Sequence, residues 1–597
     1  MTTKSLLIKD QNPSSIALLV DIWGHCSRRR RIQLCLLPVV MLASGVAELV
    51  SLGAVLPFLG VLSEPELLWQ RPLVQALAEQ VGWSNASQLV VPTALAFAAT
   101  AVLAALIRLA NLWLNGRMAA AVGSDLSCEA YRRTLLQPYG VHVARNSASV
   151  INTITVQIGQ TVGALNSMLQ LLTSSVVAVG LLVGLLLIDA QVALVAAAIF
   201  SSAYVALAML SRRELQINGR KITSASTLQI KSLQEGLGAI RDVLLNCSQN
   251  LYLETYRDAD RPQRQLGAKN AFIIAFPRYS LEALGMVAIA LLGGMLVVQR
   301  GSGTAVIPLL GALALGAQRM LPALQQVYAG WAALKSYNAS MKGVLEILDL
   351  PVPLPLTGIE PLLPRNEILM HEVHFRYGRD QPDVLRGVDL EIRVGERIGL
   401  IGSTGSGKST TVDILMGLLV PTTGKVLVDG VDLHDPQHPE RLFAWRASIA
   451  HVPQSIYLAD SSISENIAFG VPRHQIDFER VKQAAHQAQI ANYIESTLEG
   501  YESFVGERGI RLSGGQRQRI GIARALYKQA RVLVFDEATS ALDNFTEEAL
   551  MTSIEELSKE LTIVIIAHRL TTVQKCDRII SLECGKVFKQ GTPSNML

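Results

Sequence analysis

The feature that most constrains this chain is a series of long stretches without a single charged residue. Asp, Glu, Lys and Arg are absent from 80–107, 146–188, 190–211, 283–299 and 301–318. A further apolar run follows Arg31 and continues to Leu62 with one acid, Glu48. A helix that crosses a bilayer needs about 20 apolar residues, so these stretches predict an α-helical membrane domain.

Six spans fit these stretches once the uncharged but polar residues 146–165 are set aside. We expect the spans at 32–62, 89–115, 166–188, 190–210, 279–299 and 304–327. Arginines 28–31 precede the first span, and the connections after the second and fourth spans carry several Arg and Lys residues each. The other three connections carry Arg71, none and Arg300. Because positive residues favour the cytoplasmic side, the N-terminus and everything after the sixth span are predicted to be cytoplasmic.

The composition changes along the chain and predicts two domains. Residues 1–350 contain 27 basic and 18 acidic residues, whereas the remainder contains 26 and 31. Prolines cluster between 351 and 364, and proline cannot continue a helix. We therefore expect a membrane domain at 1–345, a linker at 346–366 and a soluble domain at 367–597. The charged fraction is 17%, against about 25% in soluble proteins, which argues against disorder and against binding of nucleic acid.

Several regions outside the spans also have helical patterns. The segments 116–165 and 211–278 are polar and regular, and we interpret them as cytoplasmic extensions of the membrane helices. An apolar stripe at 16–23 predicts an amphipathic helix on the inner membrane surface. A second stripe at 71–82 predicts a short helix at the outer surface. The six cysteines are scattered and indicate neither a disulfide framework nor a zinc site.

A few ionisable residues fall inside the predicted spans. Glu48, Arg108 and Arg319 lie within spans, and Arg278 lies at a span boundary. Such residues are costly in a membrane and face a partner or a cavity. Two interpretations stay open: either the charges are structural, with Glu48 as the partner of Arg108, or the arginines line a path for an anionic group.

The second half of the chain contains a phosphate-binding motif. Residues Gly402–Ser409 read GSTGSGKS and fit the pattern G-x-x-x-x-G-K-[ST] between an apolar strand at 397–401 and a helix at 408–419. Glycines in this pattern let backbone N–H groups surround phosphates at a helix N-terminus. Lys408 adds a positive charge, and Ser409 is placed to coordinate magnesium.

Another apolar strand, Val532–Phe535, ends in the acids Asp536 and Glu537. Carboxylates at the end of a parallel strand beside a phosphate loop are placed to hold Mg²⁺. We predict that Asp536 holds the metal through water and that Glu537 polarises the attacking water.

At this point the sequence resembles ABC transporters. Leu512-Ser513-Gly514-Gly515-Gln516 matches the family signature and stands 20 residues before Asp536. The other matching elements are the adenine-stacking Tyr377, the metal-linking Gln454, the exporter loop Gly506–Gly509, the dimer-interface loop Ser540–Asp543 and the switch histidine His568.

This resemblance implies six transmembrane helices followed by one α/β P-loop ATPase domain, which is the ABC exporter architecture. It implies a homodimer in a bacterial inner membrane, with each ATP held between one chain's phosphate loop and the partner's signature. Segments near 139–150 and 233–245 would be coupling helices. Glu537 and His568 would be catalytic, and Mg²⁺ would bind Ser409, Gln454 and Asp536. The residues implied in binding ATP and its metal are Tyr377, Gly402, Ser403, Thr404, Gly405, Ser406, Gly407, Lys408, Ser409, Thr410, Gln454, Ser513, Gly514, Gly515, Gln516 and Asp536.

A narrower resemblance concerns the membrane half. The segments LLQPYGVHVARNSASVINTIT, LQEGLGAIRDVLLNCSQN, AKNAFIIAFPRYSLEALG and GAQRMLPALQQVY look like bacterial flippases for polyprenyl-pyrophosphate-linked oligosaccharides. This similarity implies a lipid-linked oligosaccharide or a similar anionic, amphipathic lipid as substrate. Arg108, Arg278 and Arg319 would engage the pyrophosphate, and the helix at 71–82 would engage the lipid.

Other functions remain as alternatives. A peptide exporter often has an N-terminal protease domain, for which the 27 residues before the first basic run leave no room. A drug exporter favours an aromatic cavity, and only 5% of residues are aromatic. An ATP-gated channel is disfavoured because Glu537 and His568 are both present. Six spans exclude a soluble ATPase such as a DNA-repair protein.

Overall fold

The computed structural model describes residues 13–55, 85–188, 190–300, 306–352, 359–537, 561–567 and 573–596, with isolated positions between these ranges. Within this description the chain forms two compact units. The first, here called the helical unit, comprises residues 1–137 and 145–352. The second, the sheet unit, comprises 138–144 and 353–597.

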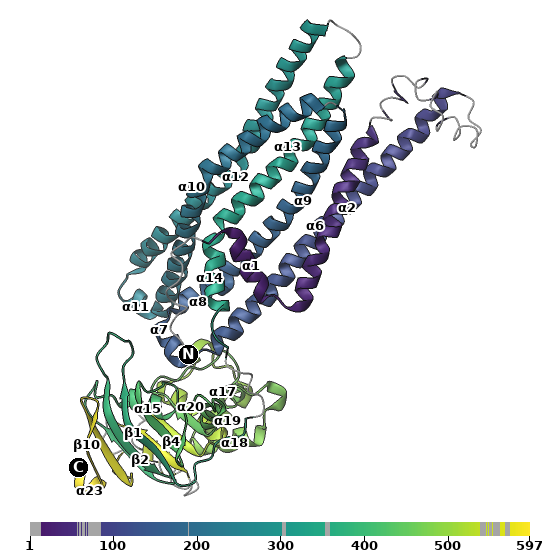
Figure 1. Ribbon diagram of the computed structural model, residues 1–597. Helices are drawn as coiled ribbons and strands as arrows, with labels where there is room; N and C mark the ends of the chain where they lie inside the picture. The colour runs from purple at the N-terminus through teal and green to yellow at the C-terminus, as the bar shows by residue number, and fades with distance from the viewer. Residues whose placement is uncertain are drawn as a thin grey trace. The chain divides into compact units, whose positions relative to one another are not determined.

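The helical unit contains long helices that pack in pairs. Helix α9 packs against α13, α10 against α12, and α2 against α6 (Figure 1). The helices are α1 (Ser15–His25), α2 (Arg28–Gly53), α6 (Val90–Leu135), α8 (Ser147–Asn152), α9 (Ile158–Ile188), α10 (Ala190–Gly238), α11 (Ile240–Leu245), α12 (Gln249–Arg300), α13 (Val306–Ser336) and α14 (Asn338–Leu348). A 3₁₀ turn (Ala86–Leu89) precedes α6, and a π-helical turn (Thr153–Gln157) joins α8 to α9.

Among the described residues, three helical stretches are long and apolar enough to cross a membrane. They are Arg28–Ser51, Ala86–Leu135 and Ser147–Gly184, and each overlaps one of the first three predicted spans. Large apolar side chains on α6 such as Leu95, Leu103 and Leu106 are more than half exposed, as expected for a helix that faces lipid. The other three predicted spans fall on α10, α12 and α13. The predicted helix at 71–82 lies outside the described residues apart from position 74.

The predicted helical extensions are present, but they are interrupted. Helix α6 continues without a break to Leu135, and α10 continues to Gly238. The segment near 139–150, where a coupling helix is predicted, forms two short helices, α7 (Tyr139–Ala144) and α8. Pro138 precedes α7 and has no N–H to extend α6. The side chain of Asn146 begins α8 by accepting a hydrogen bond from the N–H of Ala148 at 2.8 Å.

The sheet unit contains two sheets. One is antiparallel in the order β2-β1-β4-β5 and is formed by β1 (Glu367–Phe375), β2 (Leu385–Arg393), β4 (Thr423–Val428) and β5 (Val431–Asp432). The other has the order β10-β9-β3-β8-β7-β6, with every pair parallel except β10–β9. Its strands are β3 (Arg397–Ile401), β6 (Ile449–Val452), β7 (Val532–Asp536), β8 (Thr562–Ile566), β9 (Arg578–Glu583) and β10 (Lys586–Gly591).

The second sheet positions the candidate site. Strands β7 and β8 are almost wholly buried, which explains their continuous apolar sequences. Ile566 of β8 stands opposite Leu400 of β3 on one side and opposite Asp536 of β7 on the other. The end of β3 and the end of β7 therefore lie at the same edge, where ligands bind in open parallel sheets.

Candidate nucleotide site

The loop between β3 and helix α15 (Lys408–Leu415) is shaped by three glycines. Gly402, Gly405 and Gly407 have φ angles of 148°, 82° and 102°, which other residues rarely adopt. A Cβ on Gly402 would lie 2.3 Å from the carbonyl oxygen of Leu582, whereas Gly405 has open space around it. No side chain caps α15 at its start, so the N–H groups of its first turn are available to an anion.

Two polar groups in this loop point to an anionic ligand. The Lys408 side chain is buried, with 6% of its residue surface exposed, and its ammonium group donates to the carbonyl oxygens of Gly402 at 2.7 Å and Ser403 at 3.1 Å. The hydroxyl of Ser406 is buried and makes no hydrogen bond. Because buried polar groups normally have partners, an unsatisfied hydroxyl in a loop that also holds an ammonium group fits a bound phosphate.

The acids at the end of β7 lie beside Gln454, which follows β6. The Gln454 side-chain amide donates to Glu537 Oε2 at 2.6 Å. Glu537 has a φ of 49°, and its backbone N–H donates to the carbonyl oxygen of Ile566 at 3.0 Å. Non-glycine residues in this conformation are strained and cluster at functional sites. The structure thus brings together Gln454 and Glu537, which are 83 residues apart in the sequence.

The predicted adenine-stacking residue lies close to α15. The Tyr377 hydroxyl is 3.2 Å from Thr410 Oγ1, and its ring meets Phe375 edge-to-face with the centroids 4.9 Å apart. Further along α15, burial and the charge of Asp536 raise the pKa of Asp413 to about 6. The charge of Asp536 therefore reaches α15 from β7.

The signature residues form the start of a different helix, α20 (Gly514–Tyr527). The Ser513 hydroxyl accepts from the N–H of Gln516 at 3.2 Å, and the Gln516 side chain accepts from the N–H of Ser513 at 2.8 Å, a capping box. Within the part of the chain that the structure describes, no hydrogen bond or ion pair joins Ser513–Gln516 to the loop 402–407. His568 and the loop Ser540–Asp543 lie outside the described residues.

A further neighbour of the site lies in the segment 139–150, which the family resemblance predicts to be a coupling helix. Helix α7 belongs to the sheet unit, although it follows α6 in the chain. Burial and the charge of Asp413 raise the pKa of Tyr139, and a Cβ on Gly140 would lie 3.8 Å from a methyl group of Leu419. The resemblance predicts that this segment reaches the ATPase domain, but it did not identify the neighbours Asp413 and Leu419.

The predicted substrate residues have different surroundings. Arg108 forms an ion pair with Glu48 of α2 at 2.9 Å, with 50% of its side chain exposed against 8% for Glu48. Arg278 is exposed on α12, where its guanidinium lies 5.9 Å from the ring centre of Tyr279. The side chain of Arg319 lies outside the described residues. The ion pair favours the structural interpretation for Arg108.

Comparison with known proteins agrees with these observations. The profile of the ABC transporter family matches residues 385–540. A protein of Chromohalobacter salexigens named ATP-dependent lipid A-core flippase is 40% identical over 263 residues, so the match spans less than half of each chain, 44% of both. A protein of the same name from Cupriavidus metallidurans is 26% identical over 591 residues, 99% of this chain and 95% of its own. The solved structure of a bacterial Atm1-family ABC exporter with ATP bound superposes with a TM-score of 0.76 at 23% identity, over 96% of both chains.

Proposed function

Because this chain carries an ABC transporter domain on the fold of an ABC exporter, we propose that it is an ATP-driven flippase. It moves a lipid-linked saccharide from the inner to the outer leaflet of a bacterial inner membrane through six spans, with the sheet unit in the cytoplasm. The observation that carries the ATP-dependent part is the loop 402–407, where a buried ammonium group and an unsatisfied hydroxyl lie at an uncapped helix start.

In this proposal the residues at the edge of the second sheet divide the work on ATP. Lys408 and the N–H groups at the start of α15 bind the phosphates, and Tyr377 stacks on the adenine. Glu537, oriented by its hydrogen bond from Gln454, polarises the attacking water as a general base. Mg²⁺, which neutralises phosphate charge when bound, would be held by Ser409, Gln454 and Asp536. His568 acts as the switch residue.

A second copy of the chain completes each site. In the part of the chain that the structure describes, no hydrogen bond or ion pair joins Ser513–Gln516 to the loop 402–407, and these residues lie at a helix start, which suits a phosphate. Heterodimers of a Lys408→Ala chain and a Ser513→Arg chain test this arrangement, because they retain one intact loop facing one intact signature. We expect one vanadate-trapped nucleotide per mixed dimer and none in either homodimer. No trapping in the mixed dimer would show that each chain completes its own site.

The substrate part of the proposal is supported by the relatives and by the membrane arginines. Two relatives are named lipid A-core flippases. The sequence also resembles flippases of pyrophosphate-linked oligosaccharides. The substrates of both groups are lipids that carry a saccharide. A charge at the bilayer centre costs about 2.5–3.5 kcal/mol even on lenient scales. Arginine suits a phosphorylated headgroup, because its planar fork donates two hydrogen bonds at once. We propose that Arg278 and Arg319 serve this role.

Proteoliposomes that contain one candidate substrate each would test the substrate class. The candidates are a polyprenyl-pyrophosphate-linked oligosaccharide, a lipid A-core glycolipid and a peptide, each measured by ATP-dependent transport. We expect one of the two glycolipids to be moved, and Arg278→Ala with Arg319→Ala to reduce its transport while basal ATPase activity persists. Lysine at both positions should rescue transport partly. Transport of the peptide alone, or unchanged glycolipid transport in the double variant, would contradict the proposed substrate.

A further inference from the structure

The chain leaves the helical unit at two points, and a hydrogen bond joins the residues next to these two points. It leaves the helical unit after Gln137 to form α7, and again after Val352 to enter the linker. The side-chain amide of Gln137 donates to the carbonyl oxygen of Pro351 at 3.0 Å and to that of Arg133 at 2.9 Å. Gln137 is buried, so this bond is largely shielded from water.

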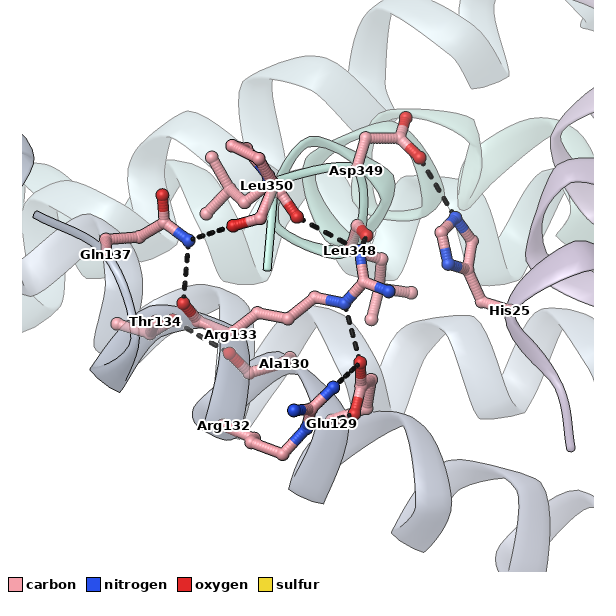
Figure 2. Close-up of polar contacts among 11 residues, drawn as sticks. His25, Glu129, Ala130, Arg132, Arg133, Thr134, Gln137, Leu348, Asp349 and Leu350 are labelled. Carbon is pink, nitrogen blue, oxygen red and sulfur yellow. Dashed lines mark hydrogen bonds and ion pairs between the residues drawn. The ribbon is translucent and has the colours of Figure 1, made fainter. Parts of the chain in front are cut away.

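Arg133, one turn earlier on α6, makes the stronger part of this connection. Its guanidinium donates to the carbonyl oxygens of Leu348 and, at 3.1 Å, of Leu350 (Figure 2). Its Nε donates to Glu129 at 2.6 Å, and this ion pair orients the guanidinium. We call Arg133, Gln137 and the backbone of 348–351 the clasp.

The clasp supplies hydrogen-bond donors to carbonyl groups at and just after the end of α14. The last carbonyl groups of a helix lack partners within the helix, and no glycine cap follows Leu348. A cation from α6 occupies this position instead, where the helix dipole favours positive charge. The imidazole of His25 on α1 is hydrogen-bonded to the Asp349 carboxylate at 2.9 Å, and Leu348 is fully buried in a core cluster that it shares with Leu126 of α6 and Ile22 of α1.

We propose that the clasp makes the ends of α6 and α14 move as one body, so that nucleotide-driven motion reaches both helices together. This inference rests on the proposed ATP-driven function. Arg133 and Gln137 would act as positioning residues: among the described residues their hydrogen bonds go to Glu129 and to backbone carbonyls of the helical unit, and their loss would weaken the coupling between ATP binding and the helical unit. Coupling free energies between sites typically correspond to factors of about 5 to 150.

A matched control lies next to Arg133. Arg132 also binds Glu129, at 2.8 and 2.9 Å, but its side chain is 51% exposed against 20% for Arg133. Within the described structure it makes no hydrogen bond to a carbonyl of 348–351. Comparison of Arg133→Met with Arg132→Met therefore separates loss of the clasp from loss of a charge and an ion pair at the same helix end. Arg133→Lys keeps one charged donor and should rescue partly, and Gln137→Leu removes the second bond without removing charge.

Hydrogen exchange of the full chain in detergent, with and without Mg²⁺-ATP, measures the coupling without any transport substrate. In the wild type and in Arg132→Met, we expect ATP to change exchange at 126–136 and 338–350 together. In Arg133→Met these two changes should fall at least about fivefold, while α15 still responds and basal hydrolysis stays within about twofold. The Arg133→Met and Gln137→Leu effects should be non-additive, because both residues belong to one connection.

Each other outcome overturns a specific statement. Equal ATP responses in Arg133→Met and Arg132→Met would show that the clasp does not couple the helices. If Arg133→Met fails to fold, Gln137→Leu and Arg133→Lys carry the same comparison, and wild-type responses in both would overturn the proposal. An absent ATP response at α15 in the wild type would instead overturn the proposed ATP-driven function itself.

Discussion

Lys408 in the sheet unit and Arg108 in the helical unit are both cations in settings that disfavour charge, yet their surroundings differ. The ammonium of Lys408 is buried and contacts backbone carbonyl oxygens in its own loop. The guanidinium of Arg108 contacts the carboxylate of Glu48, and that carboxylate is nearly buried. Carbonyl dipoles leave the charge of Lys408 available to an incoming anion, whereas Glu48 neutralises Arg108.

This difference agrees with the proposed phosphate-binding role of Lys408 and with a structural role for Arg108. A buried cation that contacts only carbonyl dipoles is costly, and a bound phosphate would offset that cost. A cation in an ion pair already has a partner for its charge. Removing either residue of the pair leaves the other charge buried without compensation, which lowers stability. The predictions below test each side of this comparison, from the largest expected effect to the smallest.

The largest effect concerns hydrolysis at the site that Lys408 serves. Glu537→Gln should reduce ATP hydrolysis about 100- to 10,000-fold, because an amide cannot act as a general base. ATP binding should persist, because the loop 402–407 is unchanged. Glu583→Gln is the matched control, since Glu583 also ends a parallel strand of the same sheet but is exposed. Steady-state ATPase and nucleotide-binding assays of both variants check this prediction. Equal rates in the two variants would remove Glu537 from the catalytic role.

The next effect concerns the backbone that surrounds Lys408. Gly402→Ala should destabilise the sheet unit by at least about 1–3 kcal/mol, the usual cost of an unfavourable backbone conformation, because its Cβ would also lie 2.3 Å from a carbonyl oxygen. Gly405→Ala shares the positive φ but meets open space, so its loss should be smaller. Thermal unfolding of both variants measures the difference. If Gly405→Ala were the more damaging change, close backbone approach at Gly402 would not explain the need for glycine there.

On the side of Arg108, a double-mutant cycle measures the ion pair. Glu48→Gln and Arg108→Gln should each lower stability, and the double variant should lose less than their sum by about 0.5–3 kcal/mol, the usual coupling of contacting residues. Transport by the double variant should persist. Arg117→Gln on the same helix serves as the control, because Arg117 lies over Trp113 rather than beside Glu48. Additive losses together with abolished transport would return Arg108 to the substrate path.

The smallest effect concerns His451, a buried histidine whose protonation is disfavoured in the native state. Burial on β6 lowers the pKa of His451 from 6.5 to about 4, so the native state keeps the imidazole neutral. At pH values between 4 and 6.5 the imidazole is protonated in the unfolded state but neutral in the native state. The free energy of unfolding must therefore fall as the pH falls through this range. By proton linkage, the free energy of unfolding should be about 1 kcal/mol lower at pH 5.5 than at pH 7.5. His451→Leu should abolish that part of the pH dependence, and the exposed His474→Gln should leave it in place. Urea unfolding at the two pH values distinguishes the variants.

Sequence reasoning was most effective where the chemistry is local. The loop 402–407, its helix and the strand before Asp536 were predicted with correct element types, because a phosphate loop needs a strand, glycines and a helix start in succession. The segment near 139–150, predicted to be a coupling helix, is divided into two short helices because Asn146 begins a new helix with its own cap, and its coupling role stays a prediction. The position of α7 beside Leu419, and the bond from Gln454 to Glu537, depend on segments far apart in the chain, which no local pattern encodes.

The sequence by itself determined that this chain has long apolar helices and an α/β domain with a phosphate-loop motif, because apolar length and motif spacing follow from bilayer thickness and from phosphate geometry. It also left two interpretations of the charged residues inside the spans: a structural role, or a path for an anionic group. Only the tertiary structure decided that Arg108 meets Glu48, that Ser406 is buried without a partner and that Arg133 occupies the end of α14. Each of these depends on distances between helices or strands, and such distances arise when elements pack together rather than from the order of residues within any one of them.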